Sequence, residues 1–153
     1  MSKREPEAAF AEAERRIAKA KAKGSAELDL YHLGLEKVPE AVAQLNQLRS
    51  LELSANRLTS LPPAIRHLTR IESLNLTENP LTSLPDWIGE LTRLTWLACQ
   101  ADNLTSIPES IGELQNLRIL SVPRNRLQSL PHSIGRLTKL NTISVRKRSG
   151  IAA

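Results

Sequence analysis

The stretch LRSLELSANRLTSLPPAIRHLTR, residues 48–70, decides the fold of this chain. Leucine, asparagine and proline occupy fixed places in it, and the same arrangement returns every 23 residues. A period of this length is the signature of a repeat protein. The first place is held by Leu48, Ile71, Leu94, Leu117 and Leu140, and the prolines with the same interval are Pro39, Pro62, Pro85, Pro108 and Pro131.

Each copy divides into an extended half and a helical half. Leu51 and Leu53 alternate with polar residues, which predicts a strand that is buried on one face. Ile65 and Leu68 follow at a helical interval, and Pro62 suits a first helical position because no amide donor is required there. No single copy can bury its leucines alone, so stacked copies must supply the core.

Two further places in the repeat carry structural expectations. Recurring glycines are expected to let the backbone turn back; they are Gly89, Gly112 and Gly135. The ninth place holds Asn56, Asn79 and Asn125, with Asp102 in one copy and Leu33 in the first. An amide can both accept and donate hydrogen bonds where the strand bends, whereas an ionised carboxylate only accepts. We therefore expect Asp102 to be a weaker link.

The pattern over residues 25–145, about five and a half copies, resembles the leucine-rich repeat family in its 23-residue form. It is similar to bacterial leucine-rich repeat proteins and to the repeats of Roco-type proteins. The resemblance implies an α/β solenoid, a right-handed horseshoe with a concave parallel sheet and short helical or 3₁₀ turns on the convex side. A preformed curved sheet favours noncatalytic recognition of a protein partner.

Residues 1–24 lie outside the repeat and predict an N-terminal capping helix. The segment is rich in Ala, Glu, Lys and Arg, and its apolar stripe comprises Phe10, Ala13, Ile17 and Ala20. Gly24 is a suitable stop for the helix. We expect this helix to cover the apolar edge of the first copy, with a basic tail at 146–153. A helix that binds a partner is the alternative.

The repeat register also predicts which side chains leave the sheet toward solvent. Trp96 stands at the third place, where most other copies have a polar residue, and Ile119 follows in the same column. An exposed tryptophan is a favoured anchor in protein interfaces. The alternative is that the indole lies flat over its neighbours. The predicted partner-binding residues are Trp96, Ile119, Tyr31, Glu52, Asn75, Gln100, Arg124 and Arg146.

Two other conspicuous side chains are assigned to packing. Cys99 holds the sixth place, equivalent to Leu53 and Val145, so it should face the core as a small hydrophobe. Trp87 lies in the helical half of its copy, on the convex side, and its side chain should pack over the neighbouring residues there. The three histidines fall at different places of the repeat, so they cannot share a metal ion with Cys99. The sequence predicts no enzyme and no cofactor.

The net positive charge of the chain comes from its two ends. The formal net charge is +5, but residues 25–145 hold eleven basic and twelve acidic side chains. Nucleic acid is therefore an unlikely partner, although the cluster Arg146, Lys147 and Arg148 keeps basic-tail binding to nucleic acid or an anionic surface as an alternative. A further alternative is the recognition domain of a larger GTPase- or ubiquitin-ligase-linked enzyme or of a bacterial effector.

Composition also indicates where in the cell the protein is expected. A single cysteine forms no internal disulfide, the N-terminus lacks an apolar leader, and no stretch reaches the roughly 18 apolar residues of a membrane span. We expect a soluble monomer in the cytoplasm, or in the host cytoplasm if the protein is a delivered effector.

Overall fold

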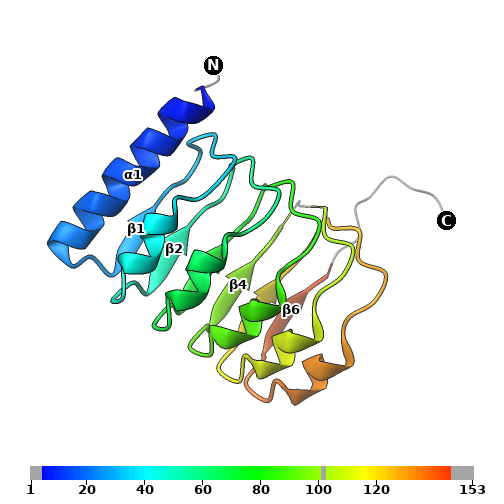
Figure 1. Cartoon of the computed structure of the whole chain (residues 1–153). Coiled ribbons are helices and arrows are strands. Elements are labelled where there is room, and N and C mark those ends of the chain that lie inside the picture. Colours follow the sequence, from blue (N-terminus) through cyan, green and yellow to red (C-terminus); the bar gives the residue numbers. More distant parts are fainter. Residues whose placement is uncertain (1–4, 101–102, 146–153) are drawn as a thin grey trace.

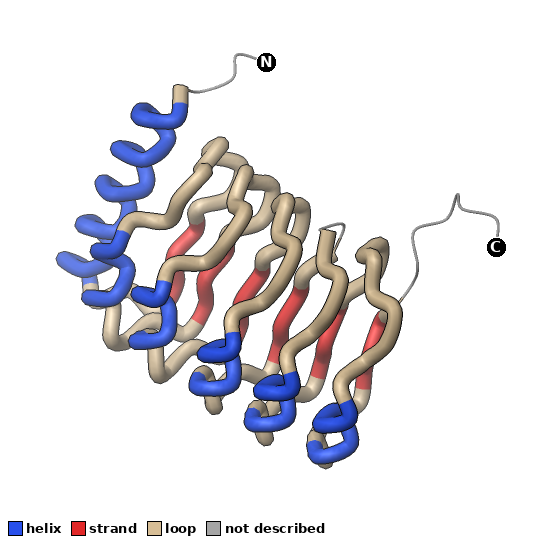
Figure 2. The backbone as a smooth tube through the Cα atoms, turned by 45° about the vertical axis from the view of Figure 1, so that its right-hand side comes forward, coloured by secondary structure: helices blue, strands red, loops and turns tan. Residues whose placement is uncertain are grey.

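The computed structural model describes residues 5–100 and 103–145, and it shows a solenoid of stacked turns (Figure 1). Its sheet has six parallel strands in the order of the sequence. The strands line one side and the short helices line the other (Figure 2). The strands are β1 Glu27–Asp29, β2 Ser50–Glu52, β3 Ser73–Asn75, β4 Trp96–Ala98, β5 Ile119–Ser121 and β6 Thr142–Ser144. The predicted fold class is confirmed.

The convex side consists of 3₁₀ helices, each preceded by one of the periodic prolines. They are η1 Glu40–Gln44, η2 Pro63–His67, η3 Asp86–Glu90, η4 Glu109–Glu113 and η5 His132–Arg136. The prediction that Pro62 opens its helix is wrong by one residue. Pro62 is extended, with φ −70° and ψ 144°, and Pro63 is the first helical residue. The other periodic prolines are extended in the same way, with ψ between 137° and 153°, and each of them also stands one residue before its helix.

Helix α1, Pro6–Lys23, covers the first turn of the solenoid at the end beside β1 (Figure 1). Its buried residues are Ala9, Ala13, Ile17 and Ala20, and Gly24 ends it with a left-handed φ of 61°. The predicted stripe is wrong at Phe10, which is 37% exposed. Residue 9 continues the i, i+4, i+8 row, whereas residue 10 lies about 100° further round the helix. Small alanines let the helix approach the first turn closely.

Polar contacts also fasten α1 to the solenoid. Arg16 donates from Nη1 to the carbonyl of Asp29 at 2.9 Å, and Lys21 donates to Oε1 of Gln44 at 2.7 Å. Glu12 accepts from both Arg15 and Arg16, at 2.7 Å and 2.8 Å. These hydrogen bonds, first that from Arg15, lower the pKa of Glu12 to about 2. The carboxylate therefore stays ionised and holds Arg16 toward β1.

The ninth-place asparagines form hydrogen bonds with backbone groups of successive turns, as predicted. Oδ1 of Asn56 accepts from the amides of Leu33, Gly34 and Leu35 at 3.2, 3.0 and 2.9 Å. Its Nδ2 donates to the carbonyls of Leu30 and Leu53, both at 2.9 Å. Asn79 and Asn125 likewise donate to carbonyls of their own and the preceding turn. Asp102 lies outside the described residues.

The prediction that the recurring glycines turn the backbone is wrong. Apart from Gly34 in the first turn, the left-handed residues in the described part of the repeat are at the eighth place: His32, Ala55, Glu78 and Arg124, with φ between 51° and 60°. Gly89 and Gly112 instead allow close packing on the convex side. A Cβ on Gly89 would lie 2.5 Å from the carbonyl oxygen of Ser110, and one on Gly112 would lie 2.5 Å from Cβ of Ser133.

Trp87, in η3, is partly buried and packs against the core, as predicted. It stands at the repeat place that Ser110 and Ser133 occupy in later turns, and the preceding turn has Arg66 where those turns face a glycine. Because Arg66 stands where the later turns have a glycine, η3 lacks on its η2 side the close glycine–serine contact that it makes with η4.

The last described strand departs from the register prediction. Val145 was expected to face the core, yet it is 42% exposed, and Ile143 of β6 is 39% exposed. The cause is position in the stack: within residues 5–100 and 103–145, β6 pairs only with β5, so no further turn covers these side chains.

Candidate functional site on the concave sheet face

The register of the sheet aligns equivalent residues of successive turns in straight columns. Trp96 pairs with Ser73 on one side and with Ile119 on the other. The column that contains them, the third-place column, is Glu27, Ser50, Ser73, Trp96, Ile119 and Thr142. The fifth-place column is Asp29, Glu52, Asn75, Ala98, Ser121 and Ser144. These two columns form what we call the concave sheet face.

At the centre of this face the indole of Trp96 and the side chain of Ile119 lie side by side on β4 and β5. Both are half-buried, so each retains exposed apolar surface. Ala98 is only 4% exposed between its neighbours. Cys99 is fully buried in the core, as predicted, at 0% exposure. Leu97 and Cys99 belong to the hydrophobic core, whereas Ala98 is covered without being part of it, which agrees with the repeat register.

A row of hydrogen bonds fixes the polar end of the concave sheet face. Asp29 Oδ1 accepts from the amide of Tyr31 at 2.8 Å. In the next two turns, Glu52 Oε1 accepts from the amide of Ser54 at 2.7 Å, and Asn75 Oδ1 from that of Thr77 at 3.1 Å. Because these three side chains each accept from the backbone amide two residues further on, they hold the ends of β1, β2 and β3 in the same conformation.

Glu52 and Asn75 are also bonded to each other. Asn75 Nδ2 donates to Glu52 Oε2 at 2.9 Å, across the β2–β3 pair. The side-chain amide of Asn75 thus links the carboxylate of Glu52 to the backbone of its own turn. Both side chains are half-buried. The repeat pattern did not predict these bonds, but the run of Asp, Glu and Asn at one place was a usable signal, because such side chains readily bond nearby backbone amides.

The remaining described residues of the predicted set lie just beyond the two columns, in the segments that follow β1, β4 and β5. Tyr31 is 55% exposed at the α1 end, and its ring centroid lies 5.7 Å from that of His32. Gln100 is half-buried, and its amide donates to Oγ1 of Thr77 at 3.3 Å. Arg124 is exposed near the opposite end. The structure therefore joins Trp96 with Ile119 and Glu52 with Asn75 but places Tyr31 and Arg124 apart.

Part of the predicted set lies outside the residues that the structure describes, namely Arg146 and the basic tail 146–153. Within the described part of the chain, no three or more His, Cys, Asp or Glu side chains group into a possible metal site. No helix of that part has the length and apolar character needed to cross a membrane.

Comparison with known proteins agrees with this geometry. The family model described as leucine rich repeat matches residues 26–81 and 46–104. Together these segments span more than half of the chain, so it belongs to the leucine-rich repeat family. None of the curated proteins matches it.

The solved structures that are similar to the solenoid include two with leucine-rich repeats. A leucine-rich repeat protein of Leptospira interrogans is 37% identical with a TM-score of 0.80, over 84% of this chain and 33% of that one. The leucine-rich repeat domain of the type III effector XopL is 25% identical with a TM-score of 0.72, over 92% of this chain and 58% of that one. The chain thus spans about a third and somewhat over half of these structures. Its fold is one that serves as a protein-interaction module.

Proposed function

We propose that this protein recognises a protein partner on the concave sheet face, without catalysis. The observation that carries the proposal is the adjacent pair Trp96 and Ile119, which presents half-buried apolar surface at the centre of a regular sheet. Interface hot spots favour large aromatic side chains in central positions that a partner can desolvate. Trp96 is the proposed anchor and Ile119 extends it.

The surrounding polar residues support the proposal because they are ordered before any partner arrives. Glu52 and Asn75 are held by each other and by backbone amides. A partner that binds such a surface immobilises few side chains, so less of the contact free energy is lost to ordering. We assign polar specificity to these two residues, together with Tyr31 and Gln100.

Charge along the solenoid supports an oriented partner. Glu27, Asp29 and Glu52 lie on β1 and β2, whereas Arg124 and Arg126 are exposed just after β5. Opposite potentials at the two ends of one surface steer a partner of reverse polarity and fix its register. The acidic part of the partner would then meet Arg124, and Arg146 would extend that end of the surface.

The proposal is tested by affinity capture from lysate of the native cell with quantitative mass spectrometry. A Trp96→Ala, Ile119→Ala double variant should lose the captured partner by about tenfold or more, since two central contacts of about 1 kcal/mol or above are removed. The control is a His67→Ala, Arg70→Ala variant, which changes one exposed residue at the end of η2 and one just after it. It should capture as much partner as the wild type.

Folding is checked by circular dichroism and thermal melting. The double variant should unfold at nearly the wild-type temperature, because neither side chain belongs to the buried core. Equal capture by the folded double variant would reject the concave sheet face as the binding surface. Extensive unfolding would assign Trp96 to structure instead.

A second candidate is that the solenoid is the recognition part of a longer protein, such as a GTPase- or ubiquitin-ligase-linked enzyme or a delivered effector. The observation that favours it is the partial coverage of the two similar structures, one of which is a domain of a type III effector. The reading frame around the coding sequence tests it. An adjoining in-frame domain would support this candidate, and stop codons on both sides would reject it.

A further inference from the structure

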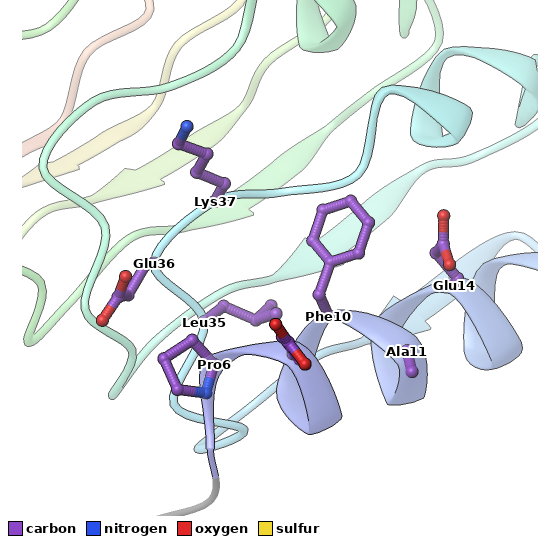
Figure 3. A pocket seen from close by; sticks show the side chains of 8 residues that line it. Pro6, Phe10, Ala11, Glu14, Leu35, Glu36 and Lys37 are labelled. Carbon is purple, nitrogen blue, oxygen red and sulfur yellow. The ribbon is translucent and has the colours of Figure 1, made fainter.

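A groove lies between the first half of α1 and the segment that follows β1, away from the concave sheet face (Figure 3). Its volume is about 440 Å³. The side chains that line it are Pro6, Glu7, Phe10, Ala11 and Glu14 of α1, with Leu35, Glu36 and Lys37 opposite. Figure 3 shows the ring of Phe10 rising from α1 toward the segment that carries Lys37.

The largest exposed apolar side chain in the groove is that of Phe10, the only phenylalanine of the chain. The helix docks through small alanines and Ile17, so the phenyl ring is not needed to seat it. The ring remains 37% exposed, next to Pro6 and Ala11 on the same face of α1. Covering exposed apolar area of this kind is favourable because it removes that surface from water.

The rim of the groove is acidic, although the chain as a whole is basic. Glu7 is accounted for by the positive end of the helix macrodipole, because it lies in the first turn of α1. Glu14 and Glu36 are exposed, and neither forms an ion pair within the described residues, in contrast to Glu12. Lys37 is the one cation among the lining residues.

We propose that this groove docks a short segment of a protein partner that carries a large apolar side chain flanked by lysine or arginine. The apolar side chain would rest against Phe10, and the flanking cations would lie beside Glu14 and Glu36. An apolar anchor supplies most of the affinity in such a site, and complementary charge sets orientation and selectivity. The site is separate from the concave sheet face.

The test begins with a display library of random peptides, selected in parallel on the immobilised wild-type protein and on a Phe10→Ala variant. Peptides enriched on the wild type alone should share one large apolar residue with neighbouring lysine or arginine. If no peptide is enriched on the wild type relative to the variant, or if the enriched peptides are acidic, the proposal is overturned.

Enriched peptides are then synthesised with a fluorophore and titrated by fluorescence anisotropy. Phe10→Ala should weaken binding about tenfold, and Glu14→Lys should weaken it by a similar factor that shrinks as salt is raised. Asp86→Lys makes the same charge change at an exposed residue of η3, so it should leave binding unchanged. Trp96→Ala should also have no effect.

Two results of the titration would overturn the proposal. One is equal affinity of the wild type and Glu14→Lys, which stays informative even if Phe10→Ala fails to fold. The other is concentration-dependent self-association of the wild type that Phe10→Ala abolishes, because a second copy of this chain would then occupy the groove. Thermal melting of each variant establishes that the fold is retained.

Discussion

At the scale of single residues, stability is concentrated in buried polar groups that link the turns. Asn56 is 7% exposed, yet it satisfies three amides of the preceding turn and donates to carbonyls of two turns. A buried backbone amide or carbonyl without a hydrogen-bond partner destabilises the folded state. Asn56 therefore stabilises the fold chiefly by giving partners to backbone groups that would otherwise have none. The same residue type recurs in the later turns for the same reason.

The substitution Asn56→Ala should lower the free energy of unfolding by about 2–4 kcal/mol, because several buried backbone groups would lose their partners at once. Urea denaturation followed by circular dichroism measures this change. Asn46→Ala is the matched control, since Asn46 is exposed, and it should alter stability by no more than about 0.5 kcal/mol. Equal effects of the two substitutions would show that the asparagine bonds contribute little.

At the scale of elements, the spacing between turns depends on which residues face one another on the convex side. Gly89 in η3 lies against Ser110 of η4, and Gly112 lies against Ser133 of η5. Side chains are small at these contacts, so the 3₁₀ helices approach closely. Gly135 has nothing within 4 Å of the place where its Cβ would stand.

The pair Gly89→Ala and Gly135→Ala isolates this packing effect. Gly89→Ala should destabilise the protein by about 1–3 kcal/mol, because the added methyl must displace backbone of the next turn. Gly135→Ala should be neutral or stabilising by about 0.4–1 kcal/mol, since it only restricts the unfolded chain. Melting temperatures of the two variants compare them directly. A larger loss for Gly135→Ala would contradict the proposed role of Gly89.

A carboxylate caps one helix from the neighbouring turn. Glu109 accepts from the amides of His132 and Ser133 at 3.1 and 3.0 Å, at the start of η5. The amide of Ser133 is the main cause that lowers the pKa of Glu109 below its ordinary value of 4.5. A lowered pKa in the folded state means that ionised Glu109 stabilises the fold above its unfolded pKa.

Glu109→Gln should therefore be less stable than the wild type at neutral pH, because a neutral amide accepts these hydrogen bonds less strongly. The difference should fade as the pH falls through the lowered pKa of Glu109, where the wild-type carboxyl also becomes neutral. Urea denaturation at a series of pH values measures it. A difference that stays constant with pH would contradict the ionic cap.

At the scale of the whole molecule, the repeat period converts sequence positions into columns in space. That conversion is why the fold, the inward position of Cys99 and the column shared by Trp96 and Ile119 could be predicted from sequence. It did not reveal the left-handed residues of the eighth place, because His32, Ala55, Glu78 and Arg124 share no residue type. Nor did it reveal the groove at Phe10, which depends on how α1 docks outside the repeat.

The most direct test of the register is the rate at which single cysteines react with a thiol reagent in the native protein. Native Cys99 should react on the order of a thousandfold more slowly than a cysteine placed at Ser73 in a Cys99→Val background, because the buried thiol must wait for the turn to open. Similar rates for the two thiols in folded protein would mean that the columns are misassigned and that Trp96 does not mark the outward surface.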